Sequence, residues 1–153
     1  MLLSIALILG IAAGLRAMTS PAAVSWAARI GLVAVAGTPL AFMGARWTPI
    51  IFTVLAIGEL VNDKLPGTPS RKVPPQFIAR IVMGGLSGAT VMASHGQVVV
   101  GILAGALGAV AGTYGGPFLR QRLAQLLNSP VAAALIEDGI AICLAVTCVM
   151  GAE

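Results

Sequence analysis

Four acidic residues stand out because each lies in or beside a strongly apolar stretch. Glu59 and Asp63 end the apolar run 47–63, and Glu137 and Asp138 lie inside the run 129–146. Apart from Glu153, they are all the acids of the chain. A carboxylate within membrane hydrocarbon is energetically costly, and such acids usually face a bundle interior or a wet cavity. These four are therefore the first candidates for binding an ion, a proton or a small solute.

The spacing of the acids predicts how they point. Glu59 and Asp63 are four residues apart and share one face of a helix. Glu137 and Asp138 are adjacent and point about 100° apart, so at most one of them lies at the centre of a given contact. The second pair lies near the middle of its apolar run. For the first pair, a position among the lipid headgroups is the alternative.

Arg16 is the candidate partner of these acids. It follows the apolar run 2–15, and its planar guanidinium could bind a carboxylate or a phosphate in two places. Two alternatives stay open. Arg16 could instead anchor its helix by reaching towards the headgroups. Glu137 and Asp138 could form a structural ion pair with Arg16, Arg29 or Arg80, or be protonated and hydrogen-bonded to the backbone.

Composition places these residues in a membrane. The chain has 153 residues, of which 58% are hydrophobic and 9% charged, against about 25% charged in soluble domains. A domain of this size buries only about 70% of its chain surface, so lipid must cover the rest. The apolar runs do not alternate with polar residues as barrel strands do. We therefore expect one all-α domain over residues 1–153, a polytopic bundle of transmembrane helices.

Apolar runs broken by Gly and Pro predict short or discontinuous helices. We expect helices at 2–15, 21–36, 48–62, 76–93, 97–112, 118–127 and 130–150, with chain breaks before Pro21 and Pro117. A full span needs about 20 apolar residues, and most of these runs are shorter. Breaks at membrane depth require protein or water to satisfy the freed backbone groups.

Basic residues predict the orientation. With six spans, one side of the membrane receives Arg16, Lys64, Arg71, Lys72, Arg120 and Arg122, and the other receives Arg29 and Arg46. The more basic side is cytoplasmic, which places the loop 64–75 and the segment 118–127 there and both termini outside. If the helix at 21–36 lies in the interface, five spans remain, Arg16 changes sides and the bias weakens. The chain has a net charge of +4, but its basic residues lie between the apolar runs, where they set the orientation in the membrane. We therefore do not expect it to bind nucleic acid.

Two series of features suggest a weak internal repeat. The half-repeats would be residues 1–66 and 96–150, joined by the helix at 76–93, with the break before Pro21 corresponding to that before Pro117. With five spans the halves would be inverted. Inverted repeats and broken helices are typical of transporters.

The remaining motifs favour packing over catalysis. Small residues at helical spacing allow close helix contact or line a narrow pathway, and one helix carries such a stripe at Gly101, Gly105, Gly108 and Gly112. His95 is the only histidine, so we expect no metal site and no cofactor. No nucleophile or phosphate-binding motif is present, so we expect no enzyme activity.

Three segments carry a resemblance to a family. They are residues 14–21 (GLRAMTSP), residues 59–71, which include ELVNDKLP and TPSR, and residues 134–142 (ALIEDGIAI). Through them the chain resembles an uncharacterised family of small bacterial integral membrane proteins, classed as a domain of unknown function. The resemblance implies a compact helical membrane domain and no assigned activity.

The sequence as a whole favours a small transporter or channel-like protein. Its carboxylates would bind a cation or carry a proton, and a homodimer is expected because so small a bundle encloses little space. One alternative is a scaffold or assembly protein whose glycine stripes dock partner helices. A lipid-modifying membrane enzyme, with the acids as general acid and base, is the less favoured alternative. For a bacterial source the location would be the cytoplasmic (inner) membrane.

Overall fold

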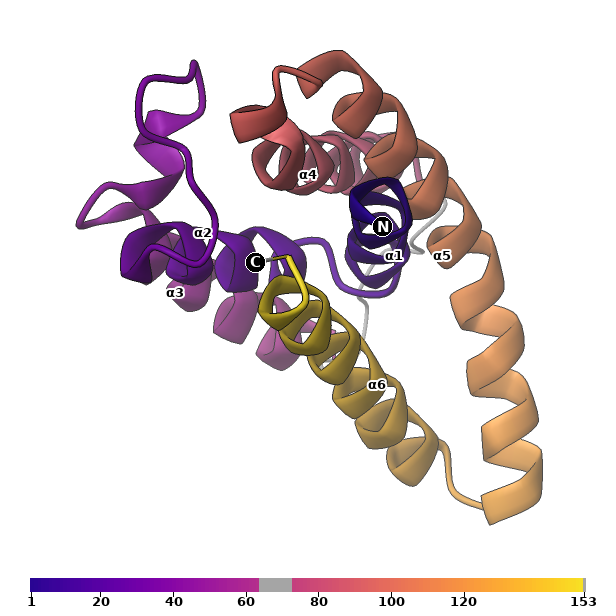
Figure 1. The fold of residues 1–153 in the computed structure, drawn as a ribbon. Coiled ribbons are helices and arrows are strands. Elements are labelled where there is room, and N and C mark those ends of the chain that lie inside the picture. The colour runs from indigo at the N-terminus through magenta and orange to yellow at the C-terminus, as the bar shows by residue number, and fades with distance from the viewer. Residues whose placement is uncertain (64–72, 153) are drawn as a thin grey trace.

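The computed structural model describes residues 1–63 and 73–152. This part of the chain is entirely helical apart from its connections, which confirms the all-α prediction (Figure 1). Its α-helices are α1 (Leu2–Leu15), α2 (Thr19–Ile30), α3 (Thr48–Asn62), α4 (Pro74–Met92), α5 (Val98–Leu127) and α6 (Pro130–Met150). Two short 3₁₀ helices, η1 (Ala41–Gly44) and η2 (Ala93–His95), lie in the connections.

Three of the helical segments are long and apolar enough to cross a membrane: α4 continued by η2, α5 and α6, with 22, 30 and 21 residues. They indicate a multi-pass membrane protein. The helices α1 and α3 are also apolar but have 14 and 15 residues. At 1.5 Å per residue they reach about 21–23 Å, short of a hydrocarbon core of about 30 Å.

Close glycine contacts hold α1, α4 and α5 together, and Figure 1 shows α1 beside the other two. Along α5, Gly105 faces Gly84 and Gly101 faces Gly88, so α4 and α5 run in opposite directions. Residues later in α5 face residues later in α1, with Gly108 against Leu7 and Gly112 against Ile11, so these two helices run in the same direction. A methyl group on any of these α5 glycines would overlap a facing carbonyl group.

This arrangement separates an apolar end of the bundle from a charged one. The core cluster joins Ile5 of α1 with Met92 at the end of α4 and with Cys148 and Val149 at the end of α6. The C-terminal end of α1, the N-terminal part of α4 and the C-terminal end of α3 lie at the opposite end, where Arg16 and the acids meet.

The break predicted before Pro21 is present, whereas the boundary predicted at Pro117 is wrong. Pro117 lies inside α5, which continues from Val98 to Leu127, so the segment 118–127 is the last part of α5 and not a separate helix. Pro117 lacks the N–H that would bind the carbonyl of Thr113, but membrane helices tolerate such a loss where neighbouring groups compensate. Pro21 lies in the first turn of α2, a position that suits proline. The break itself lies at residues 16–18.

The other helix boundaries fall close to the prediction. Those of α1, α3 and α6 are confirmed, and α4 begins two residues early. The helix predicted at 21–36 ends at Ile30, because Gly31 adopts a left-handed backbone with φ of 86°. Residues 64–72 of the predicted loop lie outside the described residues. The internal repeat of residues 1–66 and 96–150 stays a prediction. The break before Pro21 has no counterpart at Pro117, because α5 continues through that residue.

Candidate functional site: a buried charge cluster

Charged side chains from five helices meet at the end of the bundle where α1 stops. Among the residues that the structure describes, the cluster contains Arg16 (after α1), Glu59 and Asp63 (α3 and its end), Arg80 (α4), Arg120 (α5), and Glu137 and Asp138 (α6). All five predicted binding residues, Arg16, Glu59, Asp63, Glu137 and Asp138, therefore lie in one place. Residues up to 122 positions apart in the chain are in direct contact.

Arg16 is the centre of the cluster. Its backbone is extended, which ends α1 and turns the side chain between α3 and α6. Nε donates to Oδ1 of Asp138 over 2.8 Å, Nη2 donates to the same oxygen, and Nη1 donates to Oδ2 of Asp63 over 2.6 Å. Arg16 is only 1% exposed. The guanidinium thus ties three segments together, with two of its nitrogen atoms donating to a single oxygen of Asp138.

Glu59 and Arg80 hold the break between α1 and α2. The two carboxylate oxygens of Glu59 accept the N–H groups of Ala17 and Met18, each over 2.9 Å. Nη1 of Arg80 donates to the carbonyls of Gly14 and Leu15 over 2.8 and 2.9 Å, and its Nη2 lies 3.4 Å from Glu59 Oε1. A carboxylate at the start of α2 and a guanidinium at the end of α1 also suit the two helix dipoles. Glu59 therefore has a structural task.

Replacing Glu59 with glutamine tests this task. The amide keeps one acceptor but turns an NH₂ group towards a backbone N–H, so we expect a loss of about 1–3 kcal/mol in the free energy of unfolding. Hydrogen exchange should show faster exchange of the Ala17 and Met18 amides, with those in the middle of α6 unchanged. Wild-type exchange rates at these two amides would contradict the assignment.

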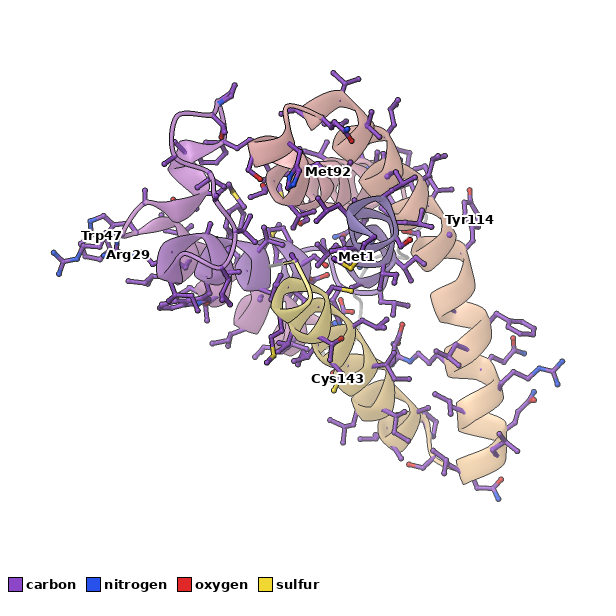
Figure 2. All side chains as sticks on the ribbon, viewed as in Figure 1. Met1, Arg29, Trp47, Met92, Tyr114 and Cys143 are labelled. Carbon is purple, nitrogen blue, oxygen red and sulfur yellow. The ribbon has the colours of Figure 1, made fainter. Side chains whose placement is uncertain are left out.

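Glu137 and Asp138 point to different neighbours, as their adjacency predicts. Asp138 faces Arg16, whereas Glu137 faces α5, with its Oε2 4.0 Å from Nη1 of Arg120. Glu137 is fully buried and the Arg120 side chain is 37% exposed. Arg29, named beforehand as an alternative partner, is exposed on α2 and points away from the bundle (Figure 2).

A cavity of about 170 Å³ lies beside the cluster. It is lined by Asp63, Arg120, Pro130, Val131 and Ala134, so it touches the end of α3, the last part of α5 and the start of α6. A single water needs roughly 10–15 Å³ of such space, so the cavity has room for a small solute together with water. Two of its five lining residues are charged, one acidic and one basic, and the other three are apolar.

Arg80 and Arg120 belong to the cluster but were not among the predicted binding residues. Arg80 is the only charged residue of α4, and the sequence predicted it as an ion-pair partner of the acids but not as a binding residue. Arg120 was attributed to membrane orientation together with Arg122. Arg122 lies over the ring of Phe118, 5.1 Å from its centre. Nothing in the local sequence separates these two arginines, because only the packing of α5 against α6 directs Arg120 towards Glu137.

Comparison with known proteins gives a family but no function. No match was found among curated proteins or among solved structures. Residues 3–150 match the model of a family described as a domain of unknown function (DUF4126), and this range contains the segments on which the resemblance was based, residues 14–21, 59–71 and 134–142. The chain therefore belongs to the DUF4126 family.

Proposed function

We propose that this protein is a small multi-pass transport protein that passes a proton or a small cation through the buried charge cluster. One observation carries the proposal: Glu137 is fully buried inside a candidate membrane span and lies opposite a partly exposed arginine, Arg120, which lines a cavity. Ionisable residues at membrane depth are costly to keep and commonly mark ion or proton pathways. The homodimer is part of the proposal.

The course of the chain supports six passes through the bundle. The end of α3 lies at the charge cluster, so its first residue, Thr48, lies towards the other end. Residue 16 is also at the cluster, so the chain must cross the bundle between residues 16 and 48. Trp26 of α2 donates to Thr53 of α3 over 3.0 Å, and Ala17 and Met18 just before α2 contact Glu59 near the end of α3, so these two helices run in opposite directions. The second pass would then combine α2 with the stretch that follows it.

The basic residues support one orientation. Arg120 and Arg122 lie in the last part of α5, at the end of the bundle that carries the cluster, whereas Arg46 lies just before α3 at the other end. With the basic end in the cytoplasm, the segment 118–127 is cytoplasmic and both termini are outside. In a bacterium this would be the cytoplasmic membrane.

The contacts of the glycine stripe favour transport over the scaffold alternative. Gly101, Gly105, Gly108 and Gly112 already face α1 and α4 of the same chain, so they are not free to dock a partner helix.

The contacts of the acids also favour transport over acid–base catalysis. Asp63 and Asp138 bind Arg16, and Glu59 binds backbone N–H groups.

Ion flux into liposomes tests the proposal. Purified protein is reconstituted with a pH-sensitive dye inside, and pH and cation gradients are imposed in turn. Wild-type protein should change the internal pH, and Glu137→Gln should reduce the flux to that of empty liposomes, because an amide can neither carry a proton nor neutralise a cation.

The matched control is Ser87→Ala, which alters a buried side chain of α4 that donates to Met83 O, outside the cluster. This variant should keep the wild-type flux at equal folded yield. Absence of flux under every gradient with folded wild-type protein, or full flux in Glu137→Gln, would overturn the proposal.

A further inference from the structure

A narrow apolar groove runs along α2, α3 and α6. Its lining residues fall within 19–26 of α2, 53–60 of α3 and 142–146 of α6, and within each helix they share one face, because they are three or four positions apart. The lining side chains are apolar except for two threonines and the indole N–H of Trp26, and that N–H donates to Thr53 over 3.0 Å. The groove therefore suits an apolar occupant.

The dimensions of the groove fit one hydrocarbon chain. Its volume is about 200 Å³, and from Thr19 to Trp26 the helix α2 rises by about 10 Å. The mean cross-section is then about 20 Å², which is the area of one extended hydrocarbon chain, whereas a helix 10 Å across needs about 80 Å². A lipid chain can lie in this groove, but a helix of a partner or of a second copy cannot enter it.

Two arginines lie where the groove ends. Arg29 follows Trp26 by three residues and so continues the same side of α2. A Cβ added at Gly44 would lie 3.3 Å from the carbonyl oxygen of Ala28, so the segment that leads to Arg46 touches the end of α2 that carries Arg29. Both arginines are exposed. Their guanidinium groups are therefore available to a group at this end of the groove.

The surroundings of these two arginines favour a negatively charged headgroup. Within the described part of the chain, every acid belongs to the cluster at the opposite end of α2 and α3, so no described carboxylate competes here. Guanidinium groups bind phosphate through paired hydrogen bonds. Tryptophans are enriched at headgroup level, and Arg46 lies over the ring of the exposed Trp47, 5.6 Å from its centre. Figure 2 shows Arg29 and Trp47 on the same side of the molecule.

We propose that this groove binds an anionic phospholipid, with one acyl chain between α2, α3 and α6 and the phosphate at Arg29 and Arg46. Pro49 is the only buried residue of α3, so an acyl chain between α3 and α6 adds apolar contact that α3 otherwise lacks. The bound lipid would thus hold the pair of α2 and α3 against α6. This inference goes beyond the transport function and stands or falls without any movement of ions.

Fluorescence quenching by brominated lipid tests the inference at Trp26 itself. The chain has two tryptophans, so Trp47→Phe leaves Trp26 as the reporter and keeps a ring beside Arg46. The full chain with this change is placed in phosphatidylcholine nanodiscs that contain rising fractions of phosphatidylglycerol brominated on its acyl chains. Brominated phosphatidylcholine, which has no net charge, is the comparison. Half-maximal quenching should need about 10-fold less of the anionic lipid, because two arginines near a headgroup favour negative charge.

Further substitutions separate the headgroup contact from the chain contact. Arg29→Ala combined with Arg46→Ala should remove the difference between the two lipids, whereas Arg122→Ala, an exposed arginine at the cluster end, should keep it. Ala56→Phe places a ring in the groove and should weaken quenching by both lipids. Leu55→Phe is the matched control, because Leu55 is exposed on α3 and does not line the groove, and it should leave quenching unchanged.

Three results would overturn the inference: equal quenching by the two lipids before any arginine is changed, a preference that survives loss of both arginines, or unchanged quenching in Ala56→Phe. If Ala56→Phe fails to fold, Ala22→Phe narrows the same groove from α2 and serves in its place. Trp26 fluorescence that neither brominated lipid quenches would show that protein covers the groove, which would also overturn the inference.

Discussion

Replacing Arg16 with methionine is expected to lower the free energy of unfolding by about 3–5 kcal/mol, the range for breaking a buried ion pair. The change leaves Asp63 and Asp138 beside each other without the guanidinium that lies between them. The loss should be seen as a lower midpoint of denaturation in detergent micelles. Arg16→Lys should recover only part of it, because a single ammonium group cannot reproduce the contacts of the planar fork.

A set of variants shows whether this loss comes from the two acids. If it does, neutralising both with Asp63→Asn and Asp138→Asn should make the Arg16→Met change much less damaging, which a mutant cycle measures as a coupling energy. Arg29→Met is the matched control, since Arg29 is exposed and points away from the bundle, and it should change stability by less than about 0.5 kcal/mol. Equal losses for Arg16→Met and Arg29→Met would show that the cluster does not stabilise the fold.

The sequence predicted three features correctly: the bounds of three helices, the directions of two adjacent acids, and the arginine that contacts the acids. The bounds of α1, α3 and α6 follow from where apolar runs meet proline and polar residues. The divergence of Glu137 and Asp138 follows from the 100° step of a helix. The choice of Arg16 as partner of the acids follows from its position at the end of an apolar run and from the geometry of guanidinium.

Long-range packing decided what the sequence could not predict. Pro117 was expected to end a helix, but its effect on the backbone is local and α5 continues past it. The α2 end at Ile30 depends on the left-handed backbone of Gly31, one glycine among 19 in the chain. The pairing of Arg120 with Glu137 depends on how the end of α5 lies against α6, and no spacing along the chain encodes that contact.

The glycine contacts between α4, α5 and α1 predict the second large effect. Gly105→Ala should lower the free energy of unfolding by about 1–3 kcal/mol, as overpacking of a tight core does. The reason is that the new Cβ would overlap the carbonyl oxygen of Gly84 and approach Cα of Gly85, both rigid backbone atoms, so that α4 and α5 must move apart. A larger side chain, as in Gly105→Leu, should prevent the three helices from assembling.

The same helix supplies a control of identical chemistry. Gly115 also lies in α5, but a Cβ added there meets no atom within 4 Å. Gly115→Ala should therefore leave stability unchanged or raise it by about 0.5–1 kcal/mol, because alanine restricts the unfolded chain more than glycine does. Unfolding in detergent micelles compares the two variants directly. Equal stability of Gly105→Ala and Gly115→Ala would contradict the backbone contact between α4 and α5 at Gly105. A specific loss at Gly105 would instead support the close backbone contact between α4 and α5 at Gly84 and Gly105.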